Sequence, residues 1–259
     1  MAEERFTDWL KGLNWIEPGD CVYVVSDMLE PAKAVKARGG KLVLGEIIDC
    51  LQTLVGQTGT LLFPAFNWDF CKGVGFDYRK TPARTGALPK EALRRSDFAR
   101  TAHPLYSFAV WGAHKEELLE NHAPDAFGEG TIFELLYRWE AKVLVMGMPA
   151  LAGTTYIHHV EQIVGVPYRY QKEFTADYTD AAGNCEKRTY RMYVRDLEMD
   201  PRHIDGFRPL EEKMRGEGTI QTSYYGSAPA HLVKVRDLDE AVRRDILEND
   251  SRNMYIYRK

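Results

Sequence analysis

The stretch Lys142-Val-Leu-Val-Met-Gly147, followed by Gly153-Thr-Thr-Tyr-Ile-His-His-Val-Glu161, carries the clearest structural signal in the sequence. The apolar run after Lys142 is typical of a strand that is buried on both faces of a sheet. Gly153 and the two threonines supply a turn, and helical spacing of the apolar residues predicts a helix over residues 155–164. Either threonine can cap that helix by accepting a hydrogen bond from its free N–H groups. A buried strand that leads through a turn into a helix is typical of an α/β fold.

The N-terminal part of the chain contains a second unit of this kind. Residues 21–25 and 60–64 are short apolar runs that predict two buried strands. Between them, apolar residues at helical spacing predict a helix that begins after Gly40 and ends at Val55. Together these parts form a βαβ unit, in which the two strands run parallel. Residues 4–13 predict an amphipathic helix in front of it.

The remainder of the chain alternates less regularly. Residues 168–194 are aromatic and β-rich, with a hairpin turn at residues 182–184, so we expect a β-rich insertion in the C-terminal half. Residues 67–88 predict a long surface loop, and residues 223–229 contain too much Gly and Ser for a core strand. Helices are also predicted at residues 88–99, 131–139 and 238–248, and strands at residues 106–111 and 253–257. The fold class is therefore α/β.

Composition and charge exclude several classes of function. The 259 residues include 34 Lys and Arg against 38 Asp and Glu, a formal net charge of −4. Because this balance offers no basic field, we expect neither nucleic acid nor an anionic membrane as a partner. The start of the sequence lacks the features of a signal peptide, and no apolar run approaches the about 20 residues that span a bilayer. We expect one cytoplasmic domain over residues 1–259.

The four cysteines, Cys21, Cys50, Cys71 and Cys185, are irregularly spaced and form no C-x-x-C pattern. This spacing argues against a disulfide framework and against a cysteine-rich zinc site. None of the four has flanking residues that would mark a nucleophile, and Cys21 and Cys50 are predicted to be buried and inert.

His158 and Glu161 are the most specific candidates for chemistry. They are three residues apart on the predicted helix, so they share one face near the carboxyl end of a buried strand, where open α/β sheets bind ligands. A carboxylate beside an imidazole fixes its tautomer and raises its basicity, as a general base requires. His159 lies about 100° further around the helix and cannot share this geometry. From spacing alone, a helix histidine satisfied by its neighbours is the simpler interpretation. A zinc site of the H-x-x-E-H type lacks its last histidine, which is Gln162 here.

Arg84 and Ser107 are weaker candidates for ligand contact. Arg84 stands among small residues and can bind a phosphate or carboxylate with two hydrogen bonds, or else cap a carbonyl or face solvent. Ser107 precedes a predicted strand and can donate to a ligand or shape the turn. The sequence has no G-x-G-x-x-G, P-loop or G-x-S-x-G pattern, which argues against a dinucleotide-binding fold, a P-loop kinase and an α/β-hydrolase.

Five short segments occur in one order along most of the chain. The most specific is Thr155-x-x-His158-x-x-Glu161, followed by Val166-Pro-Tyr-Arg169. The other four are Val24-Val-Ser26, Gly59-Thr-Leu-Leu-Phe-Pro64, Thr81-Pro-Ala-Arg-Thr-Gly86 and His103-Pro-Leu-Tyr-Ser107. In this order they resemble the aminoglycoside 3-N-acetyltransferase family, whose catalytic motif is Asn-Thr-x-x-His-x-x-Glu.

This resemblance implies an acetyl-CoA-dependent N-acetyltransferase with a three-layer α/β/α sandwich fold, distinct from the GNAT fold. Acetyl-CoA would be the co-substrate, and no metal would take part. The family's catalytic histidine and its carboxylate partner carry over to His158 and Glu161. The resemblance further implies a groove for coenzyme A, and four residues are predicted to contact the coenzyme: Ser26, Arg84, Thr85 and Ser107.

The acceptor implied by the resemblance is a small-molecule amine of an aminoglycoside or a related amino sugar. A nucleotide-linked amino sugar is the second candidate acceptor, with a role in biosynthesis rather than in antibiotic resistance. Because no cysteine is marked as a nucleophile, direct attack by the amine is favoured over a covalent acyl-enzyme. The residues are also compatible with a non-catalytic relative, and with a metal-dependent hydrolase that uses His158, His159 and Glu161. The sequence leaves open whether the chain is a monomer or a homo-oligomer.

Overall fold

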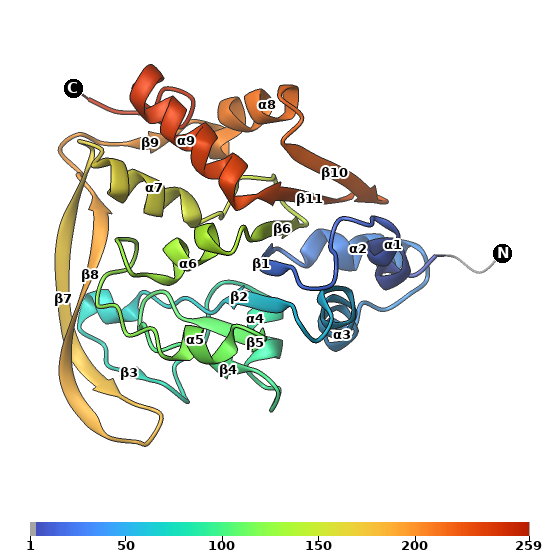
Figure 1. The fold of residues 1–259 in the computed structure, drawn as a ribbon, viewed down its shortest axis with the longest axis horizontal. Helices are drawn as coiled ribbons and strands as arrows, with labels where there is room; N and C mark the ends of the chain where they lie inside the picture. Colours follow the sequence, from blue (N-terminus) through green and yellow to red (C-terminus); the bar gives the residue numbers. More distant parts are fainter. Residues whose placement is uncertain (1–3, 259) are drawn as a thin grey trace.

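A computed structural model describes residues 4–258 and contains a seven-stranded sheet in the order β10-β11-β6-β1-β2-β5-β4 (Figure 1). At its centre, β1 (Cys21–Ser26) pairs in parallel with β2 (Thr60–Pro64) and β6 (Lys142–Met146). Antiparallel strands complete both sides: β5 (Phe108–Gly112) and β4 (Ala99–Arg100) beyond β2, and β11 (Ala228–Lys234) and β10 (Ile220–Tyr225) beyond β6. The predicted βαβ unit and the strand at residues 142–147 are thus confirmed.

The two faces of β1 belong to two different hydrophobic cores. Val22 and Val24 face one helical layer, formed by α1 (Phe6–Gly12), α2 (Leu29–Ala37), α3 (Leu44–Val55) and α4 (Ala87–Ala92). Tyr23 and Val25 face the other layer, formed by α5 (Lys115–Leu119), α6 (Ile132–Arg138), α7 (Tyr156–Val164), α8 (Arg208–Gly216) and α9 (Val235–Asn249). Both faces of the strand are covered, which is why its sequence is apolar without alternation. The three-layer α/β/α sandwich is confirmed.

The predicted β-rich insertion is a long hairpin outside the main sheet. β7 (Arg169–Thr179) and β8 (Cys185–Arg195) pair in antiparallel register, and β3 (Phe76–Asp77) adds a third strand beside β7. Figure 1 shows this hairpin along one side of the molecule, with one end beside α7. A small sheet of β9 (Arg202–His203) and β12 (Tyr255–Ile256) lies near that end.

The expectation that residues 223–229 cannot form a core strand is wrong. Residues 223–225 end β10 and residues 228–229 begin β11, so only Gly226 and Ser227 form the turn between them, and β11 pairs directly with β6. Gly226, with a φ of +60°, occupies only the turn. The small side chains Ala228 and Ala230 are buried in the sheet face beneath α2, where a helix packs close. Small residues here therefore reflect close packing and not a loop.

Other predictions differ from the structure in extent. The helix expected at residues 88–99 ends at Ala92, where the N–H groups of Arg94 and Arg95 bond to carbonyls only three residues back. Beyond it, the Arg95 guanidinium binds Asp97 and Asp49 as the chain turns towards β4. The loop at residues 67–88 contains the short 3-10 turn η1 (Asp69–Lys72) and β3, and part of it is buried. Helices α2, α5 and α8 lie outside the predicted helices.

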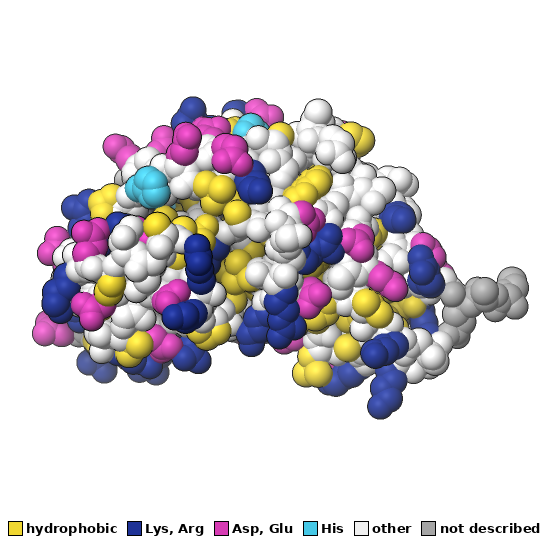
Figure 2. Space-filling model, turned by 90° about the horizontal axis from the view of Figure 1, so that it is seen from below, with side chains coloured by type: hydrophobic (Ala, Val, Ile, Leu, Met, Phe, Trp, Pro, Cys, Tyr) yellow, Lys and Arg dark blue, Asp and Glu magenta, His cyan; other side chains and the backbone are white. Residues whose placement is uncertain are grey.

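Lys and Arg side chains stand beside Asp and Glu side chains over much of the face in Figure 2. This mixture matches the near balance of charges in the sequence. Among the described residues, no helix combines the length and the apolar character that crossing a membrane requires.

Three histidines outside the predicted site are neutral in the folded chain. Burial lowers the pKa of His103 to about 3 and, together with a nearby arginine in each case, the pKa of His203 and of His231 to about 4. Each therefore takes up a proton on unfolding at mildly acidic pH. Their stabilising effect is complete above about pH 6.5 and is lost as the pH falls towards 4, at about 1.4 kcal/mol per pH unit for each histidine.

His231→Gln is expected to flatten the pH dependence of the free energy of unfolding by about 1.4 kcal/mol per pH unit between about pH 6.5 and 4.5, since one proton uptake is removed. Urea unfolding at a series of pH values measures this slope. His122→Gln changes an exposed histidine and is the matched control. If both variants kept the parental slope, His231 would not be neutral in the folded chain.

Candidate active site

The carboxyl ends of β1, β2 and β6 meet at one edge of the sheet. The chain passes from β1 to β2 on one side and only later reaches β6 on the other, so the strand order reverses at β1. A switch point of this kind leaves a crevice in which open α/β sheets bind ligands. The backbones are joined there, because Asp27 N–H donates to Met146 O at 2.9 Å. Gly147 has a φ of +76°, and a Cβ at this position would lie 1.9 Å from the Asp27 carbonyl oxygen, so only glycine fits.

A groove of about 630 Å³ opens at this switch point. Ser26 and Asp27 contribute from the end of β1, Thr85 and Gly86 from the segment before α4, and Met148 from the segment after β6. The rest of the lining is apolar: Met28, Leu29, Ala32, Leu42, Leu44 and Ala87. The Ser26 hydroxyl is buried and has no hydrogen-bond partner in the described chain. Such a group is costly unless a ligand satisfies it, so the groove is built to bind a molecule that has polar atoms.

Two of the four predicted coenzyme contacts, Ser26 and Thr85, are thus brought together in one groove. Thr85 Oγ1 also accepts a hydrogen bond from Phe66 N–H at 3.2 Å and donates to the Pro64 carbonyl, which ties the groove wall to the end of β2. Arg84 does not line the groove. Its guanidinium forms an ion pair with Asp69 and is about half exposed.

Ser107, the fourth predicted contact, is fully buried beneath the groove wall. Its hydroxyl donates to the Ala65 carbonyl at 2.9 Å and accepts from Arg100 Nε at 2.9 Å. Both of these bonds fix the segment after β2. The structure therefore separates Ser107 and Arg84 from Ser26 and Thr85.

His158 and Glu161 lie on α7, which starts from the same edge of the sheet. His158 Nδ1 is 2.7 Å from Glu161 Oε2, which confirms the geometry expected from their spacing. A carboxylate only accepts, so Nδ1 carries the hydrogen and Nε2 keeps its lone pair. No residue from 4 to 258 bonds to Nε2. The Glu161 side chain is fully buried, whereas 21% of the His158 side chain is exposed, so part of the imidazole is accessible from outside.

The first residues of β7 hold the opposite side of Glu161. Arg169 Nε lies 2.8 Å from Glu161 Oε2, and Arg169 Nη2 donates to the Tyr255 hydroxyl at 3.0 Å. The Tyr168 hydroxyl donates to Glu161 Oε1 at 3.2 Å. No sequence pattern assigns a role to Arg169 or Tyr168, although both stand in the segment that follows the Thr-x-x-His-x-x-Glu motif. Arg169 and Tyr168 thus hold the Glu161 carboxylate in place, and this carboxylate in turn orients the His158 imidazole.

The charges around this pair set its protonation state. Burial lowers the pKa of His158, the Arg169 cation lowers it further, and Glu161 opposes both. Burial alone would raise the pKa of Glu161, but His158 and Arg169 outweigh it, so the pKa lies below its ordinary value. At neutral pH, Glu161 is therefore ionised and His158 is a neutral imidazole that can accept a proton.

His159 points away from this pair, as expected. Its Nδ1 bonds to the Phe127 carbonyl. A hydrolase site that uses His158, His159 and Glu161 as metal ligands requires the three side chains to converge. They do not, and residues 4–258 contain no group of three His, Cys, Asp or Glu side chains placed to hold a metal.

The predicted threonine cap of α7 is wrong. Thr155 precedes the helix, but its side chain makes no capping hydrogen bond. Its φ of −63° and ψ of −19° are already helical, whereas a capping side chain needs an extended backbone to reach the free N–H groups. The Thr154 hydroxyl instead donates to the Ala150 carbonyl at 3.4 Å.

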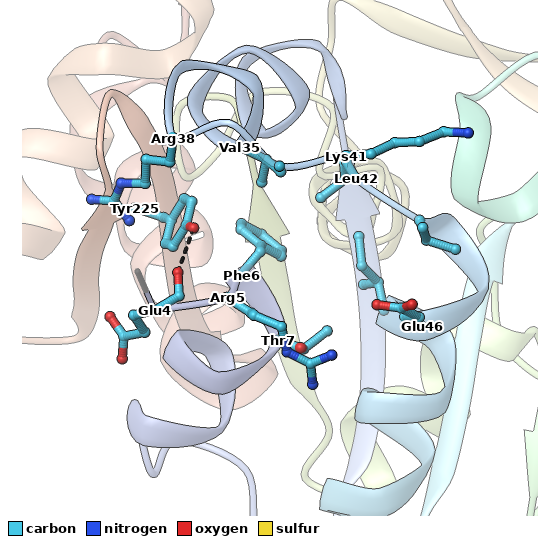
Figure 3. A pocket seen from close by; sticks show the side chains of 13 residues that line it. Glu4, Arg5, Phe6, Thr7, Val35, Arg38, Lys41, Leu42, Glu46 and Tyr225 are labelled. Carbon is cyan, nitrogen blue, oxygen red and sulfur yellow. Dashed lines mark hydrogen bonds between the residues drawn. The ribbon is translucent and has the colours of Figure 1, made fainter. Parts of the chain in front are cut away.

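A second cavity, of about 290 Å³, lies between α1, the segment before α3 and the end of β10 (Figure 3). In it, the Tyr225 hydroxyl donates to the Glu4 carbonyl at 2.7 Å, and the Arg38 guanidinium lies 4.0 Å from the centre of the Tyr225 ring. It shares Leu42 with the groove but contains no predicted site residue. We therefore place the candidate active site at the switch point and not here.

Known proteins resemble this chain in both sequence and fold. The sequence profile of the aminoglycoside 3-N-acetyltransferase family matches residues 35–246. The SPbeta prophage-derived aminoglycoside N(3')-acetyltransferase-like protein YokD of Bacillus subtilis is 25% identical, over 98% of this chain and 95% of its own. The crystal structure of the aminoglycoside acetyltransferase AAC(3)-Xa is 26% identical and covers 93% of this chain and 91% of its own, with a TM-score of 0.77. The structure of AAC-IIIb in a binary complex with CoASH is 22% identical and covers 94% and 95%, also with a TM-score of 0.77. The chain belongs to the aminoglycoside 3-N-acetyltransferase family and is an acyltransferase.

Proposed function

We propose that the chain transfers the acetyl group of acetyl-CoA to an amine of an aminoglycoside or a related amino sugar, with His158 as the general base. The observation that carries this proposal is a neutral imidazole whose Nδ1–H is held by a buried carboxylate. Family membership supports the type of reaction. The names of the relatives support the class of acceptor.

The groove fits coenzyme A. Its walls are largely apolar, and it contains the unpaired Ser26 hydroxyl, which suits a pantetheine chain of methylene and amide groups. Gly86 has a φ of +115°, and a Cβ there would lie 3.1 Å from Ser26 O. Glycine therefore lets this wall of the groove approach the end of β1 closely. Ser26 and Thr85 would hold the coenzyme, whereas Arg84 and Ser107 would support the groove wall. AAC-IIIb, which has this fold, was solved with CoASH bound. Acetyl-CoA supplies the thioester carbonyl that an amine attacks.

Side chains on α7 and β7 accept a proton from the amine and stabilise the charge that results. An amine with an ordinary pKa is mostly protonated at neutral pH and is then not nucleophilic. His158 Nε2 takes a proton from the ammonium, which frees the nitrogen lone pair to attack the thioester carbonyl. As the N–C bond forms the C–S bond breaks, and the departing thiolate takes the second proton from the nitrogen. Glu161 keeps the imidazole in the required tautomer and stabilises the imidazolium that forms. Arg169 in turn keeps Glu161 ionised.

Direct attack is favoured because the buried cysteines are poor nucleophiles. Cys21 and Cys50 are buried, as predicted. Burial raises the pKa of Cys21 and raises that of Cys50 to about 11, so neither is a thiolate at neutral pH. This supports a complex of the enzyme with acetyl-CoA and the amine together, in which His158 takes the proton directly from the amine.

The test is an acceptor panel with the purified chain and acetyl-CoA. Gentamicin, glucosamine and a UDP-linked glucosamine are each offered, and thiol release is followed together with the mass of the product. We expect saturable thiol release and a singly acetylated product with at least one of them. Coenzyme binding without turnover on any amine would instead favour a non-catalytic member of the family. Acetylation of the UDP-linked sugar alone would favour a biosynthetic role over resistance.

A further inference from the structure

The last residue of β8 carries a cation beside the candidate base. In the β7–β8 hairpin, Arg195 is the direct cross-strand partner of Arg169. Directly opposed residues of an antiparallel pair share one face, and two like charges in such a pair are unfavourable unless each finds a partner. Arg169 finds Glu161. Arg195 takes part in no ion pair within the described chain.

The Arg195 guanidinium is nevertheless held in a fixed position. Its Nη2 lies 2.8 Å from His203 Nε2. Arginine has no lone pair, so His203 must accept this bond and is therefore neutral. The His203 ring packs against the rings of Phe207 and Tyr255, with centroids 4.6 Å and 4.9 Å away. A neutral, packed imidazole thus orients Arg195 without cancelling its charge, and Arg195 remains exposed to a ligand.

The Arg195 cation lies close enough to the candidate base His158 to influence its charge. Figure 1 shows the end of the hairpin beside α7 and β9. Arg195 lowers the pKa of both His158 and His203. The carboxylate nearest to His158 is Glu161, whose charge is already balanced by Arg169. Of the two opposed arginines, Arg169 is therefore balanced by Glu161, whereas Arg195 has no carboxylate partner among the described residues.

A positive charge in this position selects among acceptors. An aminoglycoside brings several ammonium groups and is repelled, whereas an anionic group close to the amine is attracted. Guanidinium also matches phosphate and carboxylate with two parallel hydrogen bonds, so it places the group as well as attracting it.

We propose that Arg195 receives an anionic group of the acceptor, so that the preferred substrates are amino sugars that carry a phosphate or a carboxylate. Arg195 is thus a specificity-determining residue, and His203 is the positioning residue that orients it. The inference rests on the proposed function, because it concerns the acceptor of the same transfer.

Matched acceptors test the inference. Glucosamine, glucosamine 6-phosphate, a UDP-linked glucosamine, glucosaminic acid and gentamicin are compared by kcat/KM with acetyl-CoA saturating. We expect at least one anionic acceptor to exceed glucosamine by tenfold or more. Arg195→Gln should bring that ratio close to one, and Arg195→Glu should shift the preference towards gentamicin. Lys187→Gln removes the same charge from the same strand, far from His158, and should keep the parental ratios.

Inorganic phosphate provides a second readout that does not depend on choosing the right acceptor. It should inhibit competitively against whichever amine is turned over, with an inhibition constant that rises at least tenfold in Arg195→Gln and stays unchanged in Lys187→Gln. Turnover of amines with acceptor ratios and phosphate inhibition both indifferent to Arg195 would overturn this inference and leave the proposed function standing. Absence of turnover with every amine would overturn both.

Discussion

His158→Gln is expected to lower kcat for acetyl transfer by about 10²- to 10⁴-fold, the contribution that a well-placed general base usually makes. Glutamine can still donate to Glu161, so the helix and the buried carboxylate keep their contacts. It cannot take a proton from the amine. Steady-state kinetics with saturating acetyl-CoA measure the loss, which should fall on kcat and leave KM for the amine nearly unchanged.

The pH profile separates this role from a structural one. In the parent chain, kcat/KM should rise through an apparent pKa below the ordinary histidine value of 6.5, because burial and Arg169 lower the pKa of His158, and this acidic limb should disappear in His158→Gln. The defect should shrink as the pH rises through the pKa of the amine, which then needs no base. His159→Gln on the same helix should stay within a few-fold of the parent. A His158→Gln enzyme with more than a tenth of parental kcat would rule out His158 as the base.

Glu161→Ala is expected to lower the free energy of unfolding by about 3–5 kcal/mol, because it leaves the Arg169 charge without its counter-ion. The Arg169 side chain is only 5% exposed, so water cannot replace the lost carboxylate. The same substitution removes the carboxylate that fixes the tautomer of His158, so kcat should fall as well. Urea unfolding at neutral pH measures the stability, and thiol release measures the activity.

A double variant distinguishes the two effects. Replacing the buried pair with apolar residues, as in Glu161→Leu with Arg169→Met, removes both charges, and such exchanges are often neutral for stability. We expect stability within about 1–2 kcal/mol of the parent but no recovery of kcat. If the double variant were as unstable as Glu161→Ala, the unpaired arginine would not be the cause of the loss.

The parts of the site that depend on local spacing could be predicted from the sequence. His158 and Glu161 are three residues apart on one helix, so the helix itself brings them together and no knowledge of the fold is needed. The same holds for the central strands, whose apolar runs are buried on both faces. The motif could also be matched to a family because its residues are contiguous.

Contacts that depend on the whole fold could not be predicted in this way. Arg169 reaches Glu161 only because the start of β7 packs beside α7. Ser107 stands in a recognisable motif, but its hydroxyl is taken by Arg100 and Ala65, which the matched pattern does not reveal. Ala228 and Ala230 are compatible with a loop because small residues fit both a turn and a strand beneath a closely packed helix. Sequence patterns identify these residues but not their partners.

The close contact at Gly147 has a consequence for how acceptor preference can evolve. Any side chain there would collide with the Asp27 carbonyl, so the strand ends that form the groove are restricted in what they can accept by mutation. The β8 strand is under no such restriction, since most of its side chains face solvent. Substitutions at the end of this hairpin can alter the charge that meets the amine while the groove and the His158–Glu161 pair stay intact. The architecture therefore lets a lineage exchange one acceptor for another without rebuilding its chemistry.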